Sequence, residues 1–232
     1  MTQAIDQGNS PVEPGAGIAA PRRLERADME PAAQALARAF FDDPMMQYIW
    51  PQDRMRSGML PVFMRAAIKI TAPHRESFTT PGSPEGAALF LPPGKTVIPP
   101  GPMMRVLLPD IWRWRPGPFM RFMGIVNEFE HKHPPQLHWY LLVLGVDPPQ
   151  QGQGVGGMLI SEELARADAD NLPVYLETLK ARNLPFSAQH RNESDTSAPM
   201  FLCVPCDASL ECEPSGVLAA SSTSPARGHR GS

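Results

Sequence analysis

The apolar run HWYLLVLGV, His138 to Val146, and the glycine-rich loop after it constrain the fold of this chain more than any other feature. A nearly continuous apolar run of this kind is typical of a strand buried on both faces of a sheet. The loop DPPQQGQG leads into a helical pattern over residues 155–170, and PVYLE, Pro173 to Glu177, predicts a second buried strand. Strand, helix and strand in this order predict a right-handed crossover between parallel strands.

The segments ahead of this unit alternate between helical and strand patterns. Asp28 is placed as the N-cap of a first helix, and a second helical pattern covers residues 51–70. Two short apolar segments, 77–80 and 86–91, predict a hairpin. A stripe of Met and aromatic side chains runs through residues 55–123 and predicts either ordinary core or the wall of an acceptor pocket. The pattern as a whole predicts an α/β (α+β) domain.

Composition excludes several classes of protein. The net charge is −3 and no block of like charges occurs, so no electrostatic footprint for nucleic acid is present. No apolar run reaches the length of a membrane span, and the N-terminus lacks a basic segment followed by an apolar one. The three cysteines lie together near the C-terminus, which argues against a disulfide framework. We therefore expect a cytoplasmic protein with neither a nucleic-acid nor a membrane partner.

The two ends differ in composition from the middle of the chain. Residues 1–20 are rich in Gly, Pro and Ala and predict a disordered segment. Residues 187–232 are rich in Ser, Pro, Ala and Glu, and only FLCV, Phe201 to Val204, has the composition of a packed element. We therefore expect one domain over residues 21–186 and a mostly disordered tail after it.

The glycine loop between strand and helix predicts an anion site. Backbone N–H groups at the start of a helix have no partner within the helix and lie at the positive end of its dipole, where diphosphate commonly binds. A mononucleotide P-loop is excluded because no Lys follows the glycines. GQGVGG formally matches the dinucleotide fingerprint, with Glu177 about 20 residues further on. That reading is disfavoured, since DPPQQ separates the strand from the first glycine and little chain remains for a larger parallel sheet.

VDPPQQGQGVGGMLI resembles the acetyl-coenzyme A signature of the GNAT acetyltransferase superfamily, with Gln151, Gly154 and Gly156 in the signature positions. LETLKARNLPF resembles the segment in which an Asn lies near the coenzyme. The resemblance covers roughly residues 20–186 and implies a mixed, twisted sheet flanked by helices. It implies that acetyl-CoA is held by Leu144, Gly145, Val146, Gln151, Gly152, Gln153, Gly154, Val155, Gly156, Gly157 and Asn183.

The resemblance also implies a reaction, in which an amine attacks the thioester directly and takes the acetyl group. The acceptor would be a small molecule or a peptide, and the sequence leaves a homodimer open. A base must take the proton of the amine. Glu130, His138 and Glu177 are the candidates, although each also has a structural reading as a surface or strand-end polar group. His131 and His133 form too small a set for a metal, and we expect none.

The chain departs from the family pattern after Phe186. Ser187 stands where the family commonly has a Tyr that protonates the leaving thiolate, and the C-terminal strands are expected to be missing. The strand ending at Glu177 would then be an exposed apolar edge. A shifted reading frame would explain the change, and translating the other two frames tests it. The alternative to an active enzyme is a catalytically impaired CoA-binding or sensory domain.

Overall fold

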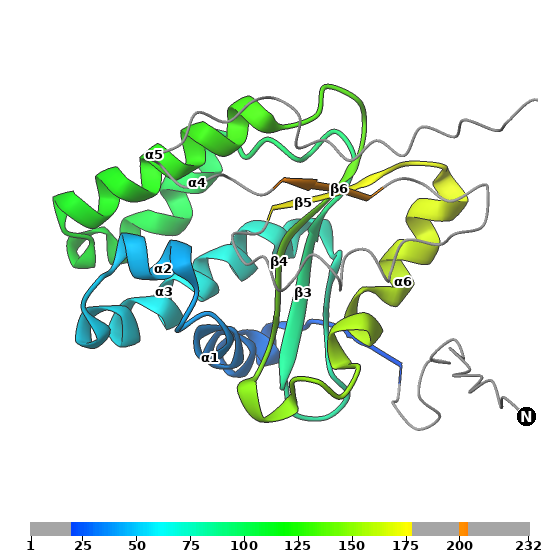
Figure 1. Ribbon diagram of the computed structural model, residues 1–232, viewed down its shortest axis with the longest axis horizontal. Helices are drawn as coiled ribbons and strands as arrows, with labels where there is room; N and C mark the ends of the chain where they lie inside the picture. The colour runs from blue at the N-terminus through cyan, green and yellow to red at the C-terminus, as the bar shows by residue number, and fades with distance from the viewer. Residues whose placement is uncertain (1–19, 178–199, 204–232) are drawn as a thin grey trace, which may run out of the picture.

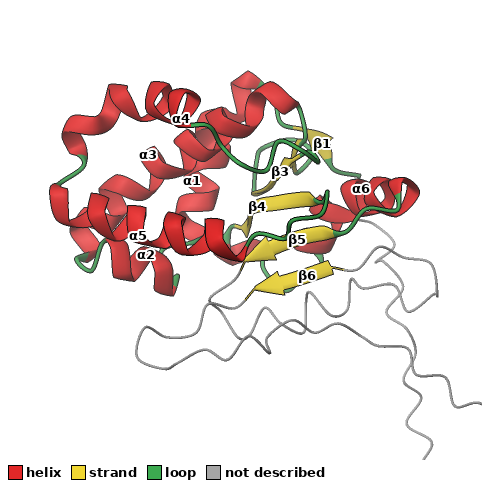
Figure 2. Cartoon of the chain, turned by 90° about the horizontal axis from the view of Figure 1, so that it is seen from above, coloured by secondary structure: helices red, strands yellow, loops and turns green. Residues whose placement is uncertain are grey.

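The computed structural model describes residues 20–177 and 200–203, which form one six-stranded mixed sheet with helices on both faces (Figures 1 and 2). The strands lie in chain order across the sheet: β1 (Arg22–Arg23), β2 (Ser77–Thr79), β3 (Gly86–Leu91), β4 (Trp139–Val146), β5 (Val174–Glu177) and β6 (Met200–Cys203). β1 to β4 pair antiparallel, and β4, β5 and β6 pair parallel.

Among the described residues, five of the six α-helices cover one face of the sheet. They are α1 (Met29–Ala39), α2 (Pro44–Ile49), α3 (Asp53–Thr71), α4 (Pro100–Leu107) and α5 (Pro116–Lys132), with 3-10 turns at Arg26–Asp28, Ala72–His74 and Leu108–Arg113. α1 and α3 contact the sheet directly, and Figure 1 shows α2, α4 and α5 further out. Leu36, Trp50, Met64 and Ile68 are almost fully buried here. The Met and aromatic stripe is therefore mainly core.

The other face carries α6 (Val155–Asp170), preceded by the turn Pro148–Gln150. Its buried side chains Leu159 and Ile160 pack against Phe90, Trp139 and Leu141 of the sheet. The β4–α6–β5 crossover and the buried central strand β4 are as the sequence predicts. The hairpin of β2 and β3 is likewise confirmed.

Two details of the helical layer differ from the sequence prediction. Asp28 occupies the N-cap position of α1, but its carboxylate accepts hydrogen bonds from Arg22 and from the Glu25 N–H instead of capping the helix. The bond from Arg22 holds the pKa of Asp28 below its usual value. Trp112, which belongs to the predicted apolar stripe, is 79% exposed, because the turn that carries it lies at the outer edge of the helical layer.

The prediction that β5 forms an exposed edge of the sheet is wrong. Met200–Cys203, which overlaps the one tail segment whose composition suits a packed element, forms β6 and pairs with β5 in parallel register from Val174↔Met200 to Glu177↔Cys203. A strand that buries little on its own gains a complete ladder of backbone hydrogen bonds at an open edge. The expected absence of C-terminal strands therefore does not hold at this edge. The other residues of the predicted N-terminal segment and tail lie outside the described part of the chain, except Ala20.

Candidate active site

In the described residues, β5 pairs with only the first part of β4. The two strands are in register from Trp139↔Val174 to Leu141↔Leu176, and β4 continues to Val146 with no further β5 partner among the described residues. This side of β4, from Leu142 to Val146, is called the gap below. On its other side β4 skips one residue against β3, because Leu89 pairs with Val143 and Phe90 with Leu141. The extra residue is Leu142, directly after the last described β4–β5 pair, and a bulge of this kind bends a strand and increases its twist.

Beyond the bulge, β4 has backbone groups facing the gap. The Asp147 N–H donates to the Glu85 carbonyl oxygen at 2.7 Å. In an antiparallel pair, residues that bond to the partner strand alternate with residues whose N–H and C=O point away from it, so this bond shows which residues of β4 face β3. Gly145 then bonds to β3, while the N–H and C=O of Leu144 and Val146 point away from β3, into the gap. The Gln151 side chain donates to the Val146 carbonyl at 2.9 Å from that side. Leu144 thus presents an amide and a carbonyl to the gap.

The glycine loop begins where β4 ends. Gly152 and Gly154 have φ of +77° and +80°, a region that glycine adopts without strain. The first intrahelical bond of α6 runs from the Met158 N–H to the Gly154 carbonyl at 3.1 Å. Within the described residues, the N–H groups of Val155, Gly156 and Gly157 therefore have no acceptor. This is the anion-binding geometry that the sequence predicts.

The loop is held to the helical layer by an ion pair. Arg38, near the end of α1, donates two hydrogen bonds to Asp147 at 2.8 and 2.6 Å, and this contact raises the pKa of Arg38. Within the loop, the Gln153 side chain donates to the Pro149 carbonyl at 3.0 Å. The first contact joins residues 109 positions apart and fixes the start of the loop relative to α1, and the second lies within the loop itself.

Gly145 has a packing role that its sequence context did not reveal. A Cβ at this position would lie 2.7 Å from Leu36 Cδ2 and 2.9 Å from Phe40 Cε2. The missing side chain therefore allows α1 to lie close against β4. The backbone of Gly145 bonds to β3, so its part in the site is to set the depth at which α1 packs.

Glu177, one of the three predicted base candidates, lies at the mouth of the gap, one position past the last β4–β5 pair. Its side chain is 5% exposed. Tyr140 Oη donates to Glu177 Oε2 at 2.8 Å, and Tyr175 Oη donates to Oε1 at 3.0 Å. His133 Nδ1 lies 3.6 Å from Oε1. Glu177, Tyr140, Tyr175 and His133 are called the Glu177 cluster below.

The other predicted candidates lie in different positions. His138 is buried directly before β4, with its ring 5.6 Å from that of Tyr175 and its Nδ1 2.8 Å from the Gln136 carbonyl oxygen. Glu130 lies in the last turns of α5. Asn183, like Ser187, lies outside the described residues.

Three members of the Glu177 cluster were missed as site residues from the sequence. Tyr140 and Tyr175 look like strand core, and His133 was considered only as part of a metal pair. For Tyr175 a signal was present: the spacing Tyr-x-Glu at Tyr175 and Glu177 places both side chains on one face of a strand. In the part of the chain that the structure describes, no group of His, Cys, Asp and Glu is suited to hold a metal ion.

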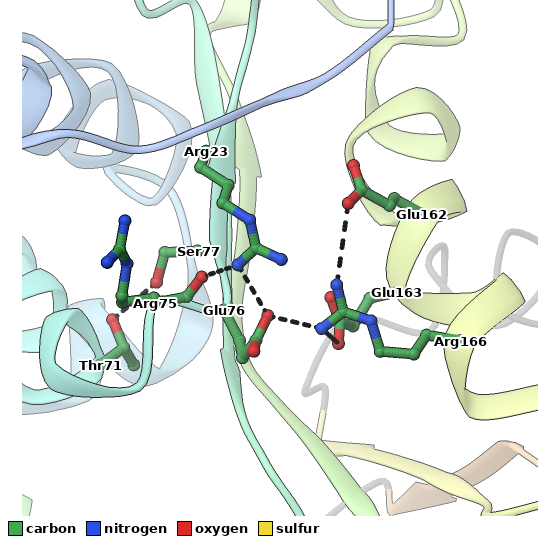
Figure 3. A network of polar contacts seen from close by, with 8 residues as sticks. All are labelled: Arg23, Thr71, Arg75, Glu76, Ser77, Glu162, Glu163 and Arg166. Carbon is green, nitrogen blue, oxygen red and sulfur yellow. Dashed lines mark hydrogen bonds and ion pairs between the residues drawn. The ribbon is translucent and has the colours of Figure 1, made fainter. Parts of the chain in front are cut away.

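A second charged cluster ties α6 to the sheet (Figure 3). Arg166 Nη1 lies 2.7 Å from Glu76 Oε2 and 3.1 Å from Glu163 Oε1. Arg23 contacts the same Glu76 carboxylate at 3.0 Å and also donates to the Arg75 carbonyl. Glu163 is fully buried, and its Oε2 has no hydrogen-bond partner in the described residues. Burial raises the pKa of Glu163 to about 7.

This raised pKa predicts how stability depends on pH. Folded Glu163 keeps its proton up to about pH 7, whereas the unfolded side chain loses it near its ordinary value of 4.5. The folded chain binds more protons between these values, so the free energy of unfolding should fall as the pH rises through this window, by at most about 1.4 kcal/mol per pH unit. Glu163→Gln should flatten that slope in urea denaturation at pH 5, 6, 7 and 8.

Glu162→Gln is the matched control for this prediction. Glu162 also approaches Arg166, at 3.8 Å, but its side chain is 46% exposed. Its substitution should leave the slope in place. An unchanged slope in Glu163→Gln would show that another group causes the pH dependence.

Comparison with known proteins agrees with this geometry. No family model matches the chain. The chain is 28% identical over 178 residues to an uncharacterised N-acetyltransferase of Schizosaccharomyces pombe, covering 72% of this chain and 71% of that protein. None of the helices in the described part is long and apolar enough to cross a membrane.

Two solved structures share the fold. A histone acetyltransferase HPA2 and related acetyltransferase of Corynebacterium glutamicum aligns with a TM-score of 0.51 at 23% identity, over 74% of this chain and 83% of that one. Arylalkylamine N-acetyltransferase 2 of Aedes aegypti aligns with a TM-score of 0.52 at 15% identity, over 75% and 81%.

The mixed sheet, with a helix that starts at a glycine-rich loop, is a fold that the chain shares with these two acetyltransferase structures. The resemblance predicted from the sequence is confirmed at this level: the fold is that of known acetyltransferases, and the chain is similar in sequence to an N-acetyltransferase.

Proposed function

We propose that the chain binds acetyl-CoA and transfers its acetyl group to an amine. The observation that carries the proposal is that two features follow one another in one segment: the N–H and C=O of Leu144 on the side of β4 away from β3, and the N–H groups without an acceptor at the start of α6. The first suits a diphosphate and the second suits an extended, amide-containing chain. CoA joins those two chemistries in one molecule. The proposed domain spans residues 21–186.

The gap between β4 and β5 would then receive the pantetheine arm. An extended arm can pair with the N–H and C=O of Leu144 as an added strand would. The arm would bring the thioester to the bulge at Leu142, beside Glu177. A backbone N–H of β4 would stabilise the oxyanion that develops when the amine attacks the thioester carbon.

Glu177 is the proposed base, because its carboxylate lies at the gap where the thioester would arrive. The attacking nitrogen forms its bond to the carbonyl carbon, the C–S bond breaks with its electron pair going to sulfur, and the proton of the amine passes to the Glu177 carboxylate. The acceptor is proposed to be a small-molecule or peptide amine. The names of the two structural neighbours suggest a first acceptor panel of histone-tail peptides and arylalkylamines.

The test has two parts. Calorimetry of the full chain should detect binding of CoA and no binding of an adenine dinucleotide, and the reverse result would refute the proposal. Mass spectrometry should then detect acetylated products from the acceptor panel with acetyl-CoA present. Binding of CoA without transfer to any amine would favour a non-catalytic CoA-binding domain.

The substitution Gln153→Glu should weaken CoA binding selectively. It places a negative charge in the loop next to the proposed diphosphate site while keeping the shape of the side chain. A like charge near an exposed anion site costs about 1 kcal/mol or more, so the dissociation constant measured by calorimetry should rise about fivefold to tenfold.

Gln34→Glu is the control, because Gln34 is exposed on α1, where its side chain donates a hydrogen bond to Glu30, far from the glycine loop in the sequence. It should leave the dissociation constant unchanged. Equal weakening by both substitutions would indicate a general effect of net charge.

A further inference from the structure

We infer that Tyr140 and Tyr175 are positioning residues that together hold the Glu177 carboxylate in place, charged and directed at the gap. This inference rests on the proposed function, in which Glu177 is the base. It assigns a part in the reaction to two tyrosines whose positions in the sequence indicate only strand core.

The sheet register places the three side chains on one face. Tyr140 of β4 is paired with Tyr175 of β5, and Glu177 follows two residues after Tyr175. Side chains two residues apart point to the same side of a strand. Glu177 follows the last β4–β5 pair of the described residues, so the carboxylate lies at the mouth of the gap and the tyrosines lie behind it, where the strands are paired.

Each oxygen of the carboxylate is bound by a different tyrosine. Tyr140 reaches across from β4 to Oε2 at 2.8 Å, and Tyr175 reaches Oε1 from the same strand at 3.0 Å. Both phenol groups are donors here, and a carboxylate that accepts hydrogen bonds is favoured in its charged form. The tyrosines are 6% and 2% exposed, so water competes little for these bonds.

The rings around the carboxylate keep the tyrosines from turning away. The His133 ring lies 4.7 Å from each tyrosine ring, in edge-to-face contact. Among the described residues, Tyr140 on β4, Tyr175 on β5 and His133 after α5 face Glu177, and the backbone of Cys203 in β6 pairs with it. The cluster thus joins residues from three separate parts of the chain.

The same tyrosines suggest a rival role that the experiment must separate. The family Tyr that protonates the thiolate is replaced by Ser187, and Tyr140 could in principle supply that proton instead. In that case the phenol would give its proton to sulfur and regain it from Glu177. Both phenol protons are already directed at the carboxylate, which favours positioning over proton donation.

The pH dependence of kcat/KM distinguishes the two roles, measured for acetyl transfer by Tyr140→Phe, Tyr175→Phe and the double variant. Loss of a hydrogen bond to the charged carboxylate should move the acidic limb of the profile to higher pH, by about one unit per bond. At pH values below the acidic limb, kcat/KM should be about tenfold lower than in the wild type, and on the plateau at higher pH it should return close to the wild-type value. Tyr48→Phe is the control, since Tyr48 is 58% exposed on α2.

Three results would overturn the inference. An acidic limb that does not move would show that the tyrosines do not hold Glu177, an equal loss of rate at all pH values would indicate structural damage alone, and a change confined to the basic limb would assign proton donation. Calorimetry with CoA on every variant shows whether the coenzyme still binds. Failure of the wild-type chain to bind CoA would count against the proposed function and not against this inference.

A readout that needs no activity tests the same point. The carboxyl carbon of Glu177 can be followed by NMR in chain labelled with ¹³C-glutamate and assigned by its absence in Glu177→Gln. Its titration midpoint should rise in Tyr140→Phe and Tyr175→Phe and stay unchanged in Tyr48→Phe. An unchanged midpoint in both cluster variants would refute the inference whatever the chain acetylates.

Discussion

Glu177→Gln should lower kcat for acetyl transfer by about 100- to 10,000-fold, the usual contribution of a general base. The amide keeps the size of the carboxylate but cannot take a proton from the attacking amine. The dissociation constant for CoA should stay within about twofold, since the proposed diphosphate site lies at the start of α6 and not at Glu177. Stopped-time product analysis by mass spectrometry and calorimetry with CoA measure the two quantities.

Glu162→Gln is the matched control, because it makes the same chemical change at a half-exposed position on α6. It should retain wild-type kcat. Should Glu177→Gln retain wild-type kcat as well, the base must be sought elsewhere, with His138 as the next candidate. His138 is 3% exposed, and its Nε2 has no hydrogen-bond partner in the described residues.

Gly86→Ala should destabilise the folded chain by about 1–3 kcal/mol, as overpacking of a well-packed site does. The added Cβ would lie 2.7 Å from the Gly145 carbonyl oxygen and 3.1 Å from Val146 Cα. Both are backbone atoms of β4, so the contact cannot be relieved by rotating a side chain. A loss of this size should lower the melting temperature by several degrees in calorimetric scans, about 2–4 °C per kcal/mol for a chain of this length.

Gly58→Ala is the control for this substitution. Gly58 lies in α3, and a Cβ there would have no heavy atom within 4 Å. Alanine is the better helix former, so the control should be neutral or stabilising by up to about 1 kcal/mol. Equal destabilisation by the two substitutions would show that close packing of β3 on β4 is not the cause.

The close packing of Gly86 on β4 also affects the proposed coenzyme site, because β3 sets the position of β4 just before the glycine loop. Displacement of Gly145 and Val146 would move both the open edge at Leu144 and the start of α6. We therefore expect Gly86→Ala to weaken CoA binding as well, in contrast to Glu177→Gln, which should leave it intact.

The backbone of the proposed coenzyme site could be predicted from the sequence because it is local. A buried strand, a loop with glycines at Gly152 and Gly154 and a helix from Val155 follow one another in a single segment. The unpaired N–H groups of a helix start are a property of any helix and need no distant contact. The same holds for the order of strand, helix and strand, whose handedness follows from the chirality of the chain.

Only the tertiary structure decided which side chains lie together. Tyr140 and Glu177 are 37 residues apart, and the contact between them depends on the register of β4 with β5. Arg38 and Asp147 are 109 residues apart, and their ion pair depends on α1 packing against Gly145. The pairing of β6 with β5 depends on an open sheet edge, which no local pattern describes.

The sequence by itself determined the strand, the glycine loop and the helix that follows it, because these depend on periodicity and on the conformational freedom of glycine within a few residues. The tertiary structure decided the bulge at Leu142, the end of the β4–β5 pairing and the cluster around Glu177. These depend on register and on packing between distant segments. A shift of one residue in that register would turn Tyr140 to the other face of the sheet.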